Sequence, residues 1–293
     1  MVDCQSRVGA ITAIGMGLNP MANYLVLNDT SSVVAAWLQA TKALSTVKKP
    51  IYNLVYSVAS PASKSAEEDA IIRNFDKFAI DHKFHSSETV ANTIFPLDTY
   101  RAKYKLGADE FYEYYLSAVL PKVKKQWGTY FERMITRLND DGTLMMKGNR
   151  RLNPLDVLID KLKRRVEKKA KTTTHYEVSV EDIALEIATY NPMRDGGYQI
   201  GGPCLSHVSF KIDRDNTLRL TAFYRSHWYI ERALGNLIGL ARLQWFVADA
   251  SGATVGPLTI IAAEAVLDLS GDCRKVPETR SLLTDCWAAG GLA

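Results

Sequence analysis

The residues of this chain with the clearest chemical potential are a cysteine, an arginine–serine pair and an asparagine within one stretch. Cys204 follows Gly-Gly-Pro, Arg225 and Ser226 come about twenty residues later, and Asn236 follows the arginine by eleven residues. A thiolate is a strong nucleophile, and a nearby guanidinium favours it by stabilising the charged form. Arginine and a hydroxyl suit a phosphate, while a carboxamide both donates and accepts hydrogen bonds. These residue types fit covalent catalysis on an anionic substrate.

Each of these residues also has an ordinary structural interpretation. A lone cysteine can be a small buried hydrophobic residue. Arg225 and Ser226 can form the end of a strand followed by a helix cap, because serine is a favoured N-cap. Asn236 can pair with backbone inside a helix bundle. The ordered spacing of the set favours the catalytic interpretation.

A predicted hairpin and helix would position these side chains. Apolar and polar residues alternate over residues 208–212 and again over 218–224, which predicts two strands. The segment 213–216, Asp-Arg-Asp-Asn, is a turn by its chemistry, because Asp and Asn bond their own backbone and tolerate left-handed geometry. A long apolar helix is expected over residues 229–247, with Asn236 inside it.

This stretch resembles the superfamily of thymidylate synthases and pyrimidine nucleotide hydroxymethylases. In that family a Pro-Cys nucleophile precedes a return strand ending in Arg-Ser, and an asparagine or aspartate follows the arginine by eleven residues. The resemblance implies one domain over residues 1–293, with a divergent part at 1–80 and a family-like core at 88–270. It also implies an α+β fold, with a large mixed β-sheet and helices packed mainly on one face.

The resemblance further implies a reaction. Cys204 would attack C6 of a pyrimidine nucleotide, so that C5 can take a methyl or hydroxymethyl group. Arg225 and Ser226 would bind the phosphate, and Asn236 would pair with O4 and N3–H of uracil. The family's one-carbon donor is 5,10-methylenetetrahydrofolate. The resemblance also implies a homodimer, in which each subunit contributes the sheet face opposite its helices.

Glu88 is a second catalytic candidate. It lies some forty residues before the aromatic segment 127–131, Trp-Gly-Thr-Tyr-Phe, which resembles the family's Gly-Pro-x-Tyr-Gly loop. The resemblance implies that Glu88 positions a water molecule beside the pyrimidine. The alternative is a glutamate that favours the dipole at a helix N-terminus.

Several positions depart from the family's pattern. The family has a histidine after its cysteine, an aspartate that bonds the pterin, two arginines lent by the partner subunit, and a histidine and a tyrosine for the ribose. Here Leu205 stands in place of the histidine after the cysteine, and Trp228 in place of the aspartate. Ile183 and Ala184 stand in place of the two arginines, and Val266 and Asp268 in place of the histidine and tyrosine for the ribose. Trp228, the candidate cofactor-binding residue, could stack on a planar ligand, or it could fill the space that a pterin would need. The departures favour a divergent enzyme with an altered substrate or donor. The alternative is a non-catalytic nucleotide-binding or scaffold protein.

The composition and charge of the chain limit the kinds of protein that it can be. The 293 residues are 47% hydrophobic and 23% charged, with a net charge of +4, which suits an anionic small molecule and does not require nucleic acid. The basic run at 161–171 fits a solvated helix face. No stretch suggests a membrane span or a signal peptide. Four scattered cysteines favour a reducing cytoplasm, and no metal site is expected.

The remaining elements are predicted from periodicity and breakers. Strands are expected over residues 51–58, within 172–190 and over 255–261, and the tail from residue 271 carries little signal. Helices are expected over residues 33–43, 66–78, 90–94, 111–120, 123–138 and 153–168.

Overall fold

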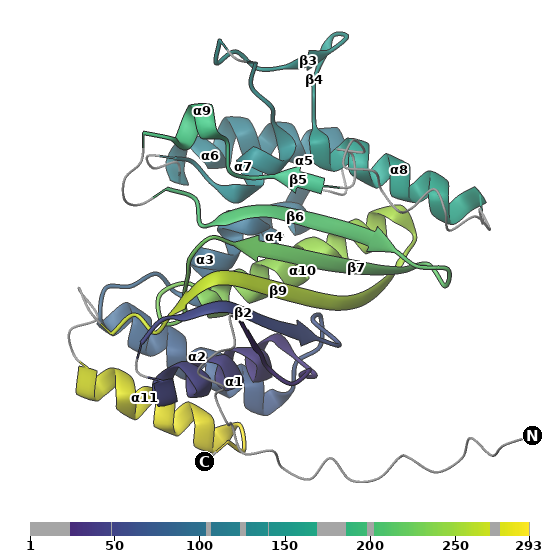
Figure 1. The fold of residues 1–293 in the computed structure, drawn as a ribbon. Helices are drawn as coiled ribbons and strands as arrows, with labels where there is room; N and C mark the ends of the chain where they lie inside the picture. Colours follow the sequence, from purple (N-terminus) through teal and green to yellow (C-terminus); the bar gives the residue numbers. More distant parts are fainter. Residues whose placement is uncertain are drawn as a thin grey trace, which may run out of the picture.

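The computed structural model describes residues 24–47, 49–103, 107–123, 127–139, 141–168, 186–197, 202–269 and 276–292. Its main feature is a seven-stranded sheet with the order β1-β2-β9-β7-β6-β5, in which β8 also pairs with β9 (Figure 1). Pairings of β1 with β2, and of β9 with β7 and β8, are parallel, and the rest are antiparallel. The predicted large mixed sheet is therefore confirmed. The strands of this sheet are β1 (Leu25–Val26), β2 (Ile51–Val58), β5 (Glu186–Ala188), β6 (Leu205–Ile212), β7 (Thr217–Tyr224), β8 (His227–Trp228) and β9 (Thr254–Val266).

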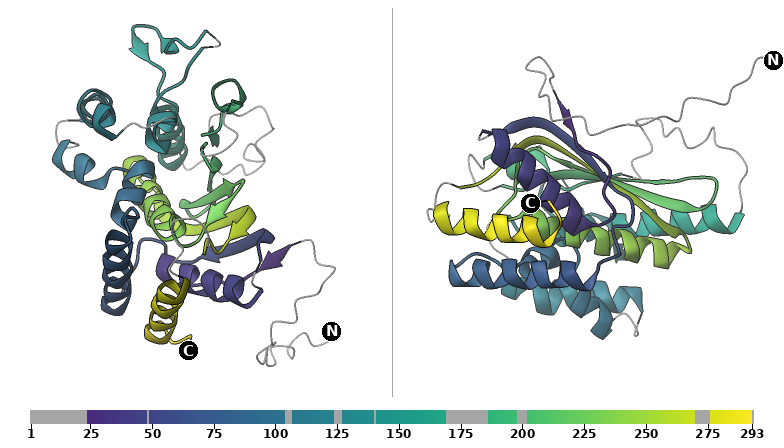
Figure 2. Two further views of the ribbon diagram at one scale, coloured as in Figure 1. Left: turned by 90° about the vertical axis from the view of Figure 1, so that its left-hand side faces the viewer. Right: turned by 90° about the horizontal axis from the view of Figure 1, so that it is seen from below.

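The helices lie mainly on one face of this sheet (Figure 2). Across the middle of that face lies α10, which is buried on nearly every side. A separate two-stranded hairpin, β3 (Met146–Lys147) with β4 (Arg150–Arg151), stands apart at one end (Figure 1). The helices are α1 (Val33–Val47), α2 (Ala66–Asp81), α3 (Ser87–Ile94), α4 (Leu97–Lys103), α5 (Ala108–Tyr114), a π-helical segment (Tyr115–Val119), α6 (Leu120–Val123), α7 (Tyr130–Ile135), α8 (Pro154–Lys168), α9 (Pro192–Asp195), α10 (Ala233–Ser251) and α11 (Val276–Ala289).

The hairpin β6–β7 forms as its alternation predicts. Leu218, Leu220, Ala222 and Tyr224 all point into the core, while the residues between them face the other side of the sheet. Asn216 in the turn has φ of 60°, a left-handed conformation that asparagine tolerates. The register holds the two strand ends together, because Leu205 lies opposite Tyr224.

Two glycines allow α10 to approach α3 closely. A Cβ on Gly235 would lie 2.5 Å from the Cβ of Val90, and one on Gly239 would lie 2.8 Å from the carbonyl oxygen of Ala91. Neither position could hold a side chain without moving α3. The contact fixes the N-terminal end of α3 beside the part of α10 that carries Asn236.

The N-terminal part of the chain belongs to the same sheet. Strand β2 pairs with β9 along its whole length, from the pair Ile51 with Ala265 to the pair Val58 with Leu258. The C-terminal helix α11 packs on α1 and α2: Trp287 Nε1 donates to Thr41 Oγ1 at 3.0 Å. The described residues between 24 and 81 therefore supply both an edge strand of the sheet and part of its helical cover.

Two of the predicted helix boundaries are wrong, and one helix was not predicted. The helix expected over 123–138 is interrupted at Gly128, whose φ of +88° ends regular helix, and α7 begins only at Tyr130. The helix expected from residue 229 begins at Ala233. The tail that carried little signal contains α11. Part of the segment 172–190 lies outside the described residues, and the strand predicted there appears as β5.

Among the described residues, no helix is both long enough and apolar enough to cross a membrane.

Candidate active site

Cys204 and Arg225 face each other at adjoining strand ends. The backbone N–H of Arg225 donates to the Cys204 carbonyl at 2.9 Å, one step beyond the last β6–β7 pair. Arg225 Nε donates to the carbonyl of Pro203 at 3.0 Å, and its guanidinium lies 5.5 Å from the centre of the Tyr190 ring. The structure thus brings the predicted cysteine and arginine together, with the thiol half-buried and Arg225 exposed.

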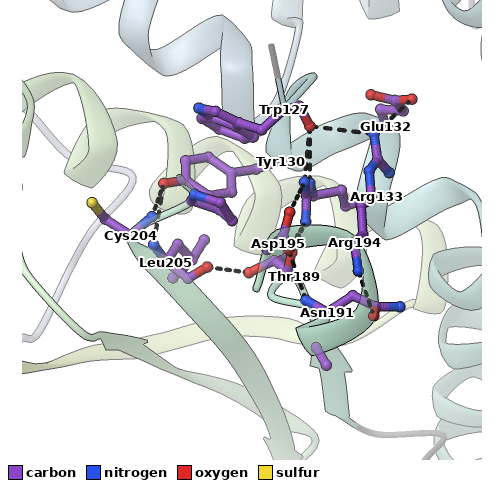
Figure 3. Close-up of polar contacts among 12 residues, drawn as sticks. Trp127, Tyr130, Glu132, Arg133, Thr189, Asn191, Arg194, Asp195, Cys204 and Leu205 are labelled. Carbon is purple, nitrogen blue, oxygen red and sulfur yellow. Dashed lines mark hydrogen bonds and ion pairs between the residues drawn. The ribbon is translucent and has the colours of Figure 1, made fainter. Parts of the chain in front are cut away.

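Tyr130 fixes the backbone at the cysteine. Its hydroxyl oxygen accepts the N–H of Cys204 at 2.9 Å and the N–H of Leu205 at 3.1 Å (Figure 3). Burial raises the pKa of Tyr130 well above its usual value, so the hydroxyl keeps its proton. Within the described part of the chain, no acceptor takes that proton. Tyr130 belongs to the aromatic segment quoted from the sequence, but sequence reasoning gave it no role.

The thiol of Cys204 is less acidic than predicted. Burial raises its pKa, and this effect outweighs the charges of Arg225 and Arg232 and a hydrogen bond from Arg225, which all lower it. Arg225 favours the thiolate, but its effect on the Cys204 pKa is smaller than that of burial. Activation of the thiol by Arg225 stays a prediction. Thiolate formation at Cys204 therefore needs a higher pH than in a free cysteine.

Arg232 is a second cation near the sulfur, which sequence reasoning missed. Its positive charge lowers the pKa of both Cys204 and Tyr130. It lies in the turn before α10, and buried Asp268 holds this turn by accepting the N–H groups of Ile230 at 2.7 Å and Glu231 at 3.0 Å. Burial raises the pKa of Asp268 to about 6. Asp268, where the resemblance expects a ribose-binding tyrosine, thus anchors the turn that carries Arg232.

Asn236 lies in the first turn of α10 and is almost fully buried. Its Nδ2 lies 3.3 Å from Nε2 of His227, another residue that sequence reasoning missed. Asn236 is therefore paired with a side chain, not with the backbone of a helix bundle.

Ser226 and Trp228 flank His227. Ser226 is half-buried in the bend between β7 and β8, and it does not cap α10, whose N-cap position is Arg232. Trp228 lies on β8 with 44% of its surface exposed. Its ring offers a surface for stacking, but position 228 lacks the carboxylate that the resemblance expects for a pterin. This residue therefore does not reproduce the folate contact of the family.

Glu88 lies in the first turn of α3 and forms a two-pronged ion pair with Arg242 of α10. The distances are 2.9 Å from Nη1 to Oε1 and 2.6 Å from Nη2 to Oε2. Hydrogen bonding from Arg242 lowers the pKa of Glu88. No hydrogen bond within the described residues joins Glu88 to Cys204, so its water-positioning role stays a prediction.

Two further expectations concern residues or groups outside this cluster. Ile183 and Ala184, at the positions of the partner's arginines, lie outside the described residues. The described residues include no cluster of three His, Cys, Asp or Glu side chains that could hold a metal ion.

Comparison with known proteins gives matches over part of the chain. No family model matches the chain. It is 41% identical over 78 residues to a Methanopyrus kandleri protein named "Putative thymidylate synthase", which is 26% of this chain and 36% of that protein. A protein of the same name from Methanococcoides burtonii is 40% identical over 63 residues, covering 22% of this chain and 29% of the relative.

The match therefore spans about a third of the length of these curated relatives. It supports a thymidylate synthase-like relationship without pointing to a particular member of that group. The α+β architecture with a large mixed sheet is compatible with this relationship.

Proposed function

We propose that this protein is a thymidylate synthase-like transferase that activates a pyrimidine nucleotide by attack of Cys204 on C6. The observation that carries the proposal is the pairing of Cys204 with Arg225 at one end of the sheet, with Arg232 and Tyr130 beside them. A nucleophile, two guanidinium groups and a neutral phenol suit addition to the electron-poor ring of a nucleotide whose phosphate is anionic.

In the first step the Cys204 thiolate forms a bond to C6. The electron pair of the C5–C6 double bond moves onto the ring carbonyl and gives an enolate, whose C5 is nucleophilic. A proton or a one-carbon electrophile then adds at C5. Loss of the original C5 proton returns the electron pair and expels the thiolate, so proton exchange at C5 needs no other reactant.

The other side chains have separate proposed tasks. Arg225, Ser226 and Arg232 bind the phosphate, because guanidinium groups match its oxygens and carry opposite charge. Tyr130 donates its free proton to the ring or to a bound water. Asn236 binds the polar edge of the base, and Trp228 stacks on a planar co-substrate. Glu88 is the weakest of the proposed catalytic residues, because Arg242 already holds its carboxylate.

The one-carbon donor that we propose is 5,10-methylenetetrahydrofolate, which would supply a methylene group to C5. This part rests on the resemblance alone. The product is then a hydroxymethyl nucleotide if water completes the reaction, or a methyl nucleotide if the folate also supplies a hydride.

We also propose that two copies associate through the sheet face opposite the helices. Phe223 and Ile261 are neighbours on that face of β7 and β9 and remain partly exposed. Tyr52 on β2 has 64% of its surface exposed. Large apolar side chains on one sheet face favour an interface.

The test is tritium release from C5-labelled dUMP, UMP, dCMP and CMP, each with and without methylenetetrahydrofolate. We expect release from one base class, lost in Cys204→Ser and kept in Cys286→Ala, which changes a buried cysteine of α11. Dependence on folate would identify the donor. Absence of release from all four nucleotides would contradict the transferase proposal.

A second candidate is a nucleotide-binding protein without catalysis. The raised pKa of Cys204 and the tryptophan at position 228 favour it. Nucleotide binding that persists in Cys204→Ser, with no tritium release from wild-type protein, would establish this candidate instead.

A further inference from the structure

A buried ion pair lies close to Cys204 without touching it. Arg133 of α7 and Asp195 of α9 join through two bonds, Nη1 to Oδ2 at 2.6 Å and Nη2 to Oδ1 at 2.7 Å. Their side chains are 3% and 0% exposed. Removing two charges from water is costly, so a buried pair is weak support for stability as such. Its contacts indicate another task.

Arg133 ties two separate backbone segments together. Nη1 also donates to the carbonyl of Thr189 at 2.7 Å. Nη2 and Nε donate to the carbonyl of Trp127 at 2.9 and 3.2 Å. Asp195 in turn accepts the N–H of Asn191 at 2.8 Å, which closes the loop between β5 and α9. The guanidinium therefore uses its planar fork to hold two carbonyl groups and one carboxylate in fixed positions.

Both segments continue to the backbone of Cys204 and Leu205. The Thr189 hydroxyl donates to the Leu205 carbonyl. In the second branch, the ring centres of Trp127 and Tyr130 lie 4.7 Å apart, and the Tyr130 hydroxyl accepts the N–H groups of Cys204 and Leu205. Figure 3 shows the two branches meeting at Leu205, at the start of β6.

We infer that Arg133 and Asp195 are positioning residues for Cys204, acting through Thr189 on one branch and Trp127–Tyr130 on the other. The inference rests on the proposed role of Cys204 as a nucleophile. The pair keeps the thiol half-buried and aimed at the ligand. Loosening it would expose the sulfur and move it from its line of attack.

This role predicts two opposite changes in one variant. Exposure of the sulfur removes part of the burial that raises the pKa of Cys204, so the pH midpoint for alkylation by iodoacetamide moves down. The misplaced nucleophile meanwhile slows C5 tritium exchange by about 10-fold to 100-fold, the usual cost of displacement by about 1 Å. A purely structural role would lower the melting temperature and change neither property.

The variants to compare are Thr189→Val, which removes only the hydroxyl bond to Leu205, together with Asp195→Asn and Arg133→Lys. Arg151→Lys is the control, because it weakens a surface pair with Glu113, at 2.7 Å, away from the site. Mass spectrometry follows alkylation of Cys204 across pH, and thermal unfolding is measured in parallel.

We expect all three variants, but not the control, to lower the midpoint and slow exchange, with kcat falling more than KM changes. If the ion-pair variants do not fold, Thr189→Val decides alone. The inference would be overturned if a folded Thr189→Val protein had the same alkylation midpoint and exchange rate as the wild type. If wild-type protein shows no exchange, the proposed function fails, and the alkylation midpoints still test the positioning role.

Discussion

Asn236 binds His227 through a contact of 3.3 Å between Nδ2 and Nε2, and both side chains are buried. The His227 ring lies flat against Tyr224, with 4.0 Å between ring centres. Burial lowers the pKa of His227 to about 3, so the imidazole is neutral at physiological pH. With Nδ2 as donor, Nε2 accepts, and the carboxamide oxygen is left for another partner.

This contact predicts that His227 controls the choice of base. Uracil offers an acceptor at O4 and a donor at N3–H, whereas cytosine offers a donor at N4 and an acceptor at N3. A carboxamide in one orientation therefore matches uracil, and the same carboxamide turned over matches cytosine. His227→Phe keeps the stacked ring and frees Asn236 to turn. We expect the ratio of tritium release from dUMP and dCMP to move toward one by about 10-fold, the scale of one paired polar contact.

Tyr224→Phe is the matched control for this experiment. The Tyr224 hydroxyl is buried without a hydrogen-bond partner among the described residues, so its removal keeps both the stacking and the His227–Asn236 contact. Its selectivity should equal that of the wild type. Unchanged selectivity in His227→Phe would contradict a role for His227 in base choice.

A second prediction concerns pH. The reactive species is the thiolate, and burial raises the pKa of Cys204, so alkylation and tritium exchange should both increase as pH rises above the usual thiol range. Arg232 opposes the effect of burial, because its charge stabilises the thiolate. Arg232→Gln should therefore shift both pH profiles further upward.

Arg219→Gln provides the control for charge. Arg219 lies on β7, and its ion pair is with Asp213 at 3.3 Å, so its loss removes the same charge from the strand that ends just before Arg225. Its profile should match the wild type. Equal shifts in Arg232→Gln and Arg219→Gln would mean that net charge, not position, sets the Cys204 pKa.

The parts of the site that the sequence predicted are those carried by local pattern. Alternation predicted β6 and β7, and the hairpin register then placed Arg225 beside Cys204. The break before α7 also had a local signal, since Thr129 caps the helix through the N–H of Glu132 at 3.1 Å. Apolar residues on both sides obscured it, and one long helix was predicted.

The missed parts depend on contacts between distant segments. Tyr130 reaches Cys204 across 74 residues, and Arg133 reaches Asp195 across 62. Arg232 acts on the sulfur only because Asp268 fixes the turn before α10. A single sequence gives no measure of such proximity, because each side chain also fits an ordinary surface or core position.

A third prediction tests the association of two copies. Ile261→Lys places a charge on the sheet face opposite the helices, beside Phe223. Burying an unpaired charge at an interface is strongly unfavourable, so a dimer should dissociate. Light scattering after size-exclusion chromatography measures the mass directly. Ile80→Lys is the control, because Ile80 on α2 is 64% exposed on another surface. A wild-type protein with the mass of one chain would contradict the dimer proposal.

The last prediction concerns the ion pair between Glu88 and Arg242. Arg242 lowers the pKa of Glu88, so folding favours the ionised form. The resulting stability is complete above about pH 5 and is lost as pH falls through the lowered folded pKa. Because 46% of the Glu88 side chain is exposed, solvent screening limits the pair to about 1 kcal/mol. Urea unfolding of Glu88→Gln should therefore show a loss of that size at pH 7 and almost none at low pH.

The same variant separates the two interpretations of Glu88. If the carboxylate mainly anchors α3 to α10, Arg242→Gln should lose as much stability as Glu88→Gln, and tritium exchange should stay within a few-fold of the wild type in both. Glu113→Gln, in the surface pair with Arg151, should change neither property. Loss of exchange in Glu88→Gln, with exchange kept in Arg242→Gln, would instead assign Glu88 the water-positioning role, because only that outcome requires the carboxylate itself.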